Sequence, residues 1–200
     1  MEAKKSILIT GGSNGIGAAL AEEYASNGNF LAISGRNSER LNKIAERCRN
    51  KGAVVETAVV DVVDITEMTK WISNVNSRVC LDLVIANAGI AGGGDGVGKG
   101  AAATHKIFQT NINGVLNTVI PTLEVMKEQG HGQIAIMSSL AAFRGFPSTP
   151  AYSATKAAVK VWGEGLRARY AANGIQVSVI CPGFVQSGMT KHNPFPMPLI

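Results

Sequence analysis

Three side chains in the second half of the chain have types and spacings suited to moving a proton. Tyr152 precedes Lys156 by four residues, so on a helix the two side chains share one face. A phenol with a pKa of about 10 is a poor proton carrier at neutral pH, but a nearby ammonium favours the phenolate and lowers that pKa. Ser139 lies thirteen residues before Tyr152. The set is compatible with acid–base chemistry, although a tyrosine and lysine at this spacing alone are also typical of an ordinary helix pair.

A glycine cluster near the N-terminus has the pattern of a phosphate-binding loop. Residues 10–17 read TGGSNGIG and include Ser13, Asn14 and Ile16. Gly11 can make a tight turn, Gly15 lets the backbone approach a ligand, and Gly17 lets a helix pack closely on a strand. The positive end of that helix attracts a pyrophosphate. Because the cluster lies between a predicted strand and a predicted helix, it indicates dinucleotide binding rather than a merely flexible turn.

The end of the second predicted strand bears on the choice of dinucleotide. An enzyme that prefers NAD usually places a carboxylate about 20 residues after the glycines, but this count from Gly15 reaches Gly35, followed by Arg36. A guanidinium is suited to a 2′-phosphate. The sequence therefore favours NADP(H), with NAD(H) as the alternative, unless Arg36 is an ordinary surface arginine at the start of a helix.

The elements that must position these residues alternate regularly. Short β-branched runs predict strands at 6–9, 30–34, 54–60, 83–87, 133–138 and 176–180, and amphipathic runs predict helices at 15–26, 38–50, 65–75, 108–129 and 151–172. Strict alternation predicts one α/β domain over residues 1–200: a doubly wound parallel sheet of the Rossmann type, with helices on both faces in three layers. Ligands of such sheets bind at the carboxyl ends of the strands.

The charge and the composition of the chain limit the classes of partner and the cellular location that we expect. The net charge is +5, but Glu39 and Glu46 interrupt the basic stretch at 36–51 and no aromatic residues alternate with it, which argues against nucleic acid. No apolar run approaches the ~18 residues of a membrane span.

Three separated cysteines and no leader pattern favour the cytoplasm. The three histidines, His105, His131 and His192, have no metal-ligand spacing. Charged residues make up only 16% of the chain, which is compatible with surface buried in a homodimer or homotetramer.

Several motifs together carry a family resemblance. The combination of Thr10-Gly11-x-x-x-Gly15-x-Gly17, Asn87-Ala88-Gly89, Asn111, Ser139, Tyr152-x-x-x-Lys156 and Pro182-Gly183 resembles the classical short-chain dehydrogenase/reductase family in order and spacing. It covers nearly the whole chain.

The resemblance implies a role for each matching position. Thr10 and the glycines would hold the pyrophosphate, Asp61 and Val62 would contact adenine, and residues 87–89 would lie beside the cofactor ribose. Pro182 and Gly183 would cover the nicotinamide, with Val185 and Ser187 in the same segment. Ser139 would bind the substrate oxygen and Tyr152 would pass it the proton. Lys156 would also bind the nicotinamide ribose, and Asn111 would anchor a water that relays protons to Lys156.

The implied activity is an NADP(H)-dependent interconversion of a small ketone or aldehyde and an alcohol by hydride transfer. A catalytically silent dinucleotide-binding regulator or scaffold is the alternative, and an epimerase or dehydratase of nucleotide sugars is a third. Family members usually continue about fifty residues past the position of Ile200. Residues 184–200 are therefore expected to begin a substrate-binding loop, and a seventh strand is expected beyond residue 200.

Overall fold

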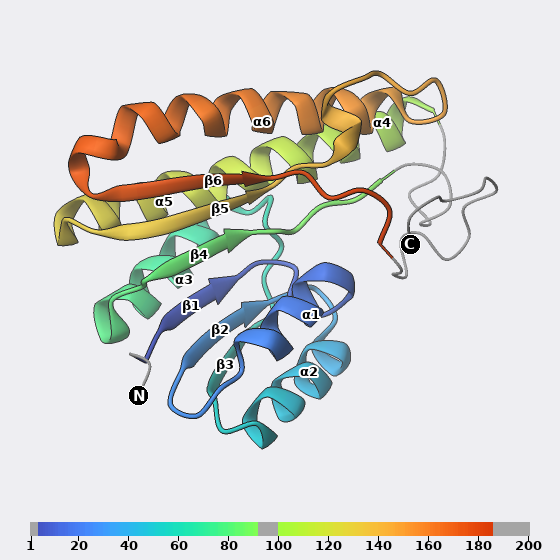
Figure 1. Ribbon diagram of the computed structural model, residues 1–200. Helices are drawn as coiled ribbons and strands as arrows, with labels where there is room; N and C mark the ends of the chain where they lie inside the picture. Colours follow the sequence, from blue (N-terminus) through green and yellow to red (C-terminus); the bar gives the residue numbers. More distant parts are fainter. Residues whose placement is uncertain (1–3, 92–99, 186–200) are drawn as a thin grey trace.

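The computed structural model describes residues 4–91 and 100–185, and its centre is one sheet of six parallel strands (Figure 1). The strand order is β3-β2-β1-β4-β5-β6. The strands are β1 (Ser6–Ile9), β2 (Phe30–Ser34), β3 (Val54–Ala58), β4 (Leu83–Ala86), β5 (Gly132–Met137) and β6 (Ile175–Ile180). The order reverses between β1 and β4, and this is the point where a doubly wound sheet opens a crevice for ligands.

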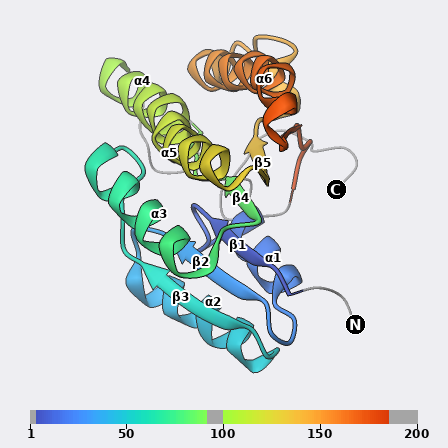
Figure 2. The ribbon, with the colours of Figure 1, turned by 90° about the vertical axis from the view of Figure 1, so that its left-hand side faces the viewer.

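Helices cover both faces of the sheet. Figure 2 shows α1 (Gly15–Tyr24) and α2 (Ser38–Asn50) on one side and the remaining helices on the other. The second group comprises α3 (Ile65–Val79), α4 (Ala101–Phe108), α5 (Gly114–Gln129) and α6 (Pro150–Tyr170). Two apolar clusters fill the spaces. One joins α1 and α2 to Ile7, Ile9 and Leu31, and the other joins α3, α5 and α6 to Leu8, Val84 and Ile134. The predicted three-layer fold is confirmed.

The structure differs from the sequence prediction mainly around residue 108. The predicted helix at 108–129 corresponds to a π-helical turn over Gln109–Asn113 followed by α5, and Phe108 is the last residue of a separate helix, α4. The sequence prediction missed α4 because its start follows a glycine-rich stretch and its run of small residues has no apolar periodicity. The other predicted boundaries agree within four residues, and β1, β2 and α2 match at both ends.

Two glycines of α6 test the packing of this helix on the sheet. A Cβ on Gly163 would lie 2.6 Å from Val179 Cγ2 and 3.0 Å from Ile136 Cδ1, whereas a Cβ on Gly165 would meet nothing within 4 Å. Gly165→Ala should raise the free energy of unfolding by about 0.5–1 kcal/mol through helix propensity. Gly163→Ala should lower the free energy of unfolding by about 1–2 kcal/mol, because α6 is already in contact with β5 and β6 at Gly163 and an added methyl group would overlap them. Urea denaturation of both variants measures the difference, and shifts of the same sign would contradict this packing.

Candidate active site

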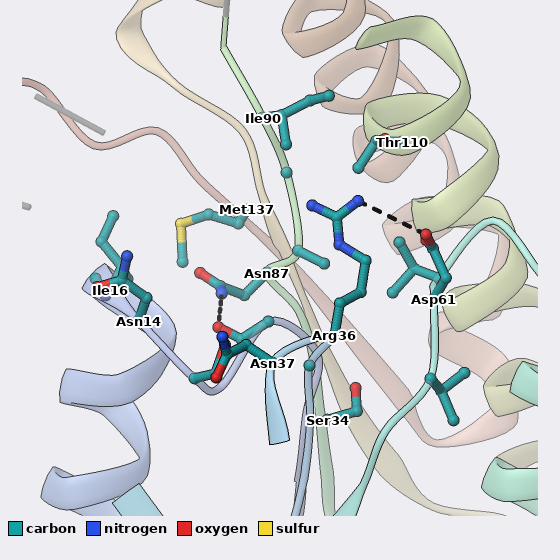
Figure 3. Close-up of a pocket in the computed structure, with 18 of the residues that line it drawn as sticks. Asn14, Ile16, Ser34, Arg36, Asn37, Asp61, Asn87, Ile90, Thr110 and Met137 are labelled. Atoms are coloured by element: carbon teal, nitrogen blue, oxygen red, sulfur yellow. Dashed lines mark hydrogen bonds and ion pairs between the residues drawn. The ribbon is translucent and has the colours of Figure 1, made fainter. Parts of the chain in front are cut away.

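A cavity of about 350 Å³ lies at the carboxyl ends of the strands. It contains most of the predicted site residues, and Figure 3 shows part of its lining. The predicted residues that line it are Gly11, Ser13, Asn14, Gly15, Ile16, Arg36, Asp61, Val62, Asn87, Ala88, Gly89, Tyr152 and Lys156. Residues from both halves of the chain therefore face one space.

The glycine loop connects β1 to the N-terminus of α1. Gly11 and Gly15 have φ angles of 68° and 54°, which favour glycine at both positions. A Cβ on Gly17 would overlap the Gly11 carbonyl oxygen, so this glycine lies behind the cavity and allows α1 to pack closely. The Asn14 side chain caps the helix by accepting from the Gly15 N–H at 2.8 Å, and the first turn carries no acidic residue. A helix start of this kind suits a diphosphate.

Thr10 and Asn87 join the ends of β1 and β4. The buried Thr10 Oγ1 accepts from the backbone N–H groups of Asn87 at 3.1 Å and Ala88 at 3.2 Å. In return, Asn87 Nδ2 donates to the carbonyl oxygens of Thr10 at 3.0 Å and Gly11 at 3.4 Å. The pair holds the glycine loop and the Asn87-Ala88-Gly89 segment in a fixed relation. Thr10 acts from behind the cavity and does not line it.

Arg36 follows β2 and lines the end of the cavity that lies beside β2 and β3. Its guanidinium faces the Asp61 carboxylate (Figure 3). The distance from Arg36 Nη1 to Asp61 Oδ2 is 3.7 Å, and both side chains are about half exposed. Asn37 and Arg40 also line this end. Asn37 caps α2 by accepting from the Arg40 N–H at 2.8 Å. Among the described residues, this end of the cavity therefore has two guanidinium groups and one carboxylate.

Lys156 is buried, and its Nζ donates to the Met137 carbonyl oxygen at 2.8 Å. No carboxylate forms an ion pair with it among residues 4–91 and 100–185. Burial lowers the pKa of Lys156 to about 8, with a smaller opposing effect of Cys181. The Lys156 amine can therefore gain or lose a proton near neutral pH.

The expected effect of Lys156 on Tyr152 was wrong. The pKa of the Tyr152 phenol is raised by burial, and the only opposing effect is a side-chain hydrogen bond with Ser139. The Lys156 amine lies 5.7 Å from the centre of the Tyr152 ring and donates to the Met137 carbonyl instead. In this structure Ser139, rather than Lys156, favours the phenolate.

Ser139 and Asn111 flank the cavity without lining it. Ser139 Oγ accepts from the Ala141 N–H at 3.1 Å at the start of the short 3₁₀ helix Leu140–Ala142. The buried Asn111, in the π-helical turn, accepts from the Ile90 N–H at 2.8 Å and donates to the Ile90 carbonyl at 2.9 Å and to Thr155 Oγ1 at 3.1 Å. Its side chain thus connects the segment after β4 to α6, and its expected role in anchoring water stays a prediction.

The remaining predicted positions follow β6. The Pro182 carbonyl accepts from the Leu140 N–H at 2.9 Å, which places this segment beside Ser139. Neither Pro182, Gly183 nor Val185 lines the cavity. Ser187 and most of the predicted loop at 184–200 lie outside the described residues.

Sequence reasoning missed nine residues that line the cavity: Ser34, Gly35, Asn37, Arg40, Val60, Ile90, Thr110, Met137 and Ser138. Most of them immediately precede or follow a residue that was predicted. Their position at the carboxyl end of a strand was therefore a usable signal. Thr110 and Arg40 lie on helical turns and had no such signal.

The comparisons with known proteins cover nearly the whole chain. A model of the short chain dehydrogenase family matches residues 5–195. The chain belongs to the short-chain dehydrogenase/reductase family. It is an oxidoreductase, and the predicted family is confirmed.

Three similar proteins illustrate the relationship. An uncharacterised oxidoreductase of Myxococcus xanthus is 34% identical over 197 residues, which are 98% of this chain and 78% of the relative. A short-chain dehydrogenase/reductase from Burkholderia phymatum in complex with NAD is 28% identical, with a TM-score of 0.86 over 94% of this chain and 68% of that one. ElxO with NADP bound is also 28% identical, with a TM-score of 0.84 over 92% and 75%. Similarity of this degree does not distinguish the two cofactors.

The described part of the chain has no group of three or more histidine, cysteine, aspartate or glutamate side chains that could hold a metal ion. Within the same part, no helix has the length and apolar character needed to cross a membrane.

The buried amine predicts a pH-dependent stability. The pKa of Lys156 falls from 10.5 to about 8 in the folded protein, so the charged form opposes folding. This destabilisation is fully present below pH 8 and disappears as the pH rises towards 10.5. Lys156→Met should raise the free energy of unfolding at pH 7 by about 1–2 kcal/mol. Removal of the buried charge stabilises the folded state by more than loss of the hydrogen bond to the Met137 carbonyl destabilises it.

Urea denaturation between pH 7 and 10.5 measures this effect. The gain should shrink steadily as the pH rises, and Lys43→Met on exposed α2 should leave the wild-type profile unchanged. A Lys156→Met variant that is less stable than wild type at pH 7 would contradict the lowered pKa.

Proposed function

We propose that the protein interconverts a small ketone or aldehyde and an alcohol, with NADP(H) as the preferred cofactor and Tyr152 as the proton donor or acceptor. The observation that carries this proposal is one cavity lined both by Arg36, which follows β2, and by Tyr152 and Lys156 of α6, which packs on β5 and β6 on the far side of β1 and β4. Between them lie the glycine loop and the N-terminus of α1. This arrangement fits the adenosine, pyrophosphate and nicotinamide of a dinucleotide in that order.

Charge at the Arg36 end supports NADP(H). Asp61 is the only carboxylate among the described lining residues, and Arg36 lies beside it, with Arg40 on the same rim. A 2′-phosphate carries negative charge and accepts bidentate hydrogen bonds from a guanidinium. NAD(H) has no 2′-phosphate, so with NAD(H) bound the positive charges of Arg36 and Arg40 would be balanced only by the Asp61 carboxylate.

The nicotinamide, when bound, supplies or accepts the hydride. Tyr152 holds the proton that the substrate oxygen gains during reduction, and its raised pKa keeps it protonated at neutral pH. The single hydroxyl hydrogen of Ser139 is donated to the substrate oxygen before the proton moves, and to the Tyr152 phenolate once the proton has left. Lys156, with a pKa of about 8, returns a proton to the site. In this scheme Asn111 positions the segment that ends at Ile90 against α6.

The proposal also covers the predicted residues that do not line the cavity and the extent of the domain. Thr10 and Gly17 support the cofactor loop from behind, and Pro182, Gly183, Val185 and Ser187 contact the cofactor from the segment after β6. Residues 1–200 form one cofactor-binding and catalytic domain, with a substrate loop starting at residue 184.

The proposed oligomeric state is based on exposed apolar side chains, and the proposed cellular location is based on free cysteines. Exposed Phe108, Ile120 and Val161 lie on the neighbouring helices α4, α5 and α6, which supports a homodimer or homotetramer formed through this face (Figure 2). The free cysteines Cys48, Cys80 and Cys181 support a cytoplasmic location.

Tyr152→Phe tests the assignment of the acid. This variant should bind NADPH as wild type does, because the ring remains, and should lose at least about 100-fold in kcat because it has no transferable proton. NADPH oxidation with a panel of ketones and aldehydes measures turnover, and NADPH fluorescence measures binding. Survival of turnover in Tyr152→Phe would show that another group donates the proton. Turnover of no carbonyl compound by wild type would favour the silent binding protein.

Arg36→Ala tests the cofactor preference. Loss of the guanidinium should weaken NADPH binding by about tenfold or more and change NADH binding by less than about twofold, because only NADPH has the 2′-phosphate. Arg47→Ala is the matched control and should change neither, because Arg47 lies on α2, does not line the cavity and is paired with Glu22 at 3.2 Å. Calorimetric titration with both cofactors measures the constants. An equal loss for NADPH and NADH would remove the case for a 2′-phosphate contact.

A further inference from the structure

An asparagine outside the cavity holds the turn that carries Asp61. Asn117 lies on α5 and is buried, and its side-chain Nδ2 donates to two consecutive backbone carbonyls, Val62 at 2.9 Å and Val63 at 3.2 Å. The two N–H groups of one amide thus hold the turn between β3 and α3 from a position 55 residues away in the sequence. No family motif identified in the sequence includes Asn117.

A glycine on the same helix makes this close approach possible. A Cβ on Gly114 would lie 2.6 Å from Val62 Cγ2 and 3.2 Å from Val62 Cβ. Any larger residue would push the turn away from α5. Gly114 and Asn117, three residues apart, therefore present one face of α5 to the turn.

The position of this turn determines where Asp61 lies relative to Arg36. Asp61 Oδ1 accepts from the Val63 N–H at 3.2 Å, and the Asp61 carbonyl accepts from the Asp64 N–H at 3.0 Å. Asp61 Oδ2 in turn faces Arg36 Nη1 at 3.7 Å (Figure 3). Val60, Asp61 and Val62 all line the cavity, whereas Asn117 does not.

We propose that Asn117 is a positioning residue for the adenosine end of the cofactor. Its two hydrogen bonds hold Asp61 and Val62 at the cavity wall and Asp61 beside Arg36. The inference rests on the proposed function, because it assumes that a dinucleotide occupies this cavity. It predicts a defect that is confined to ligands with an adenosine moiety.

Asn117→Leu removes the two donors and keeps the number and branching of the side-chain heavy atoms, and Thr122→Val is the matched control. Thr122 is also a buried polar residue of α5, but its Oγ1 donates within the helix, to the Thr118 carbonyl at 2.7 Å. Gly114→Ala is a second variant that disturbs the turn by contact and leaves Asn117 intact.

Hydrogen exchange of the ligand-free proteins gives the first readout. Amides of Val63 and Asp64 should exchange at least about tenfold faster in Asn117→Leu and Gly114→Ala than in wild type or Thr122→Val, because the turn loses its contact with α5. Unchanged exchange at these two amides in both variants would overturn the proposal.

Binding of cofactor fragments gives the second readout. Asn117→Leu should weaken 2′,5′-ADP and NADPH by about tenfold and leave reduced nicotinamide mononucleotide within about twofold of wild type. A merely structural defect would weaken all three together, and that result would overturn the proposal, as would wild-type affinity for 2′,5′-ADP in both turn variants. If wild type itself bound none of the three, the proposed function would fail as well, so the two failures are distinguishable.

Discussion

The buried amine of Lys156 is the constraint on which the structure around Tyr152 depends. An amine removed from water loses hydration that one hydrogen bond, to the Met137 carbonyl at 2.8 Å, replaces only in part. The neighbouring elements hold it there. Ser138 Oγ donates to the Lys156 carbonyl at 2.8 Å, and a Cβ on Gly89 would lie 3.3 Å from Nζ. The end of β5, the start of α6 and the segment after β4 therefore all meet at this side chain, and the resulting pKa of about 8 suits it to exchange protons.

The other half of the cavity has a different organisation, in which neutral hydrogen bonds position charged groups. Thr10 and Asn87 tie the glycine loop to β4, and Asn117 ties the turn after β3 to α5. None of these contacts requires a buried charge, and the charged pair of Arg36 and Asp61 remains partly exposed. Such a pair contributes little to stability. Arg36 is therefore free to exchange Asp61 for a phosphate, which connects the fold to the proposed preference for NADP(H).

The sequence predicts the features that depend on neighbouring residues, but not the contacts between segments that are far apart in the chain. Periodicity located β1, β2 and α2 at both ends, because buried parallel strands and amphipathic helices have clear patterns. Glycine spacing located the loop between β1 and α1, because the positive φ angles of Gly11 and Gly15 and the close packing at Gly17 require glycine. The contact of Asn117 with Val62 and Val63 had no signal in either segment, since it exists only once α5 packs beside the end of β3. The pKa of Tyr152 depends in the same way on burial and on the direction in which Lys156 donates, and the helical spacing of these two residues shows neither.

The most direct test of the account is a pH titration of the protein by NMR, with ¹³C-labelled lysine side chains. Burial of Lys156 predicts one lysine resonance that titrates near pH 8, is absent in Lys156→Met, and shifts when NADPH is added because Lys156 lines the same cavity as Arg36. A Lys156 resonance that titrates near pH 10.5, the ordinary value for a lysine, and is unaffected by NADPH would contradict both the electrostatics of the site and the proposed place of the cofactor.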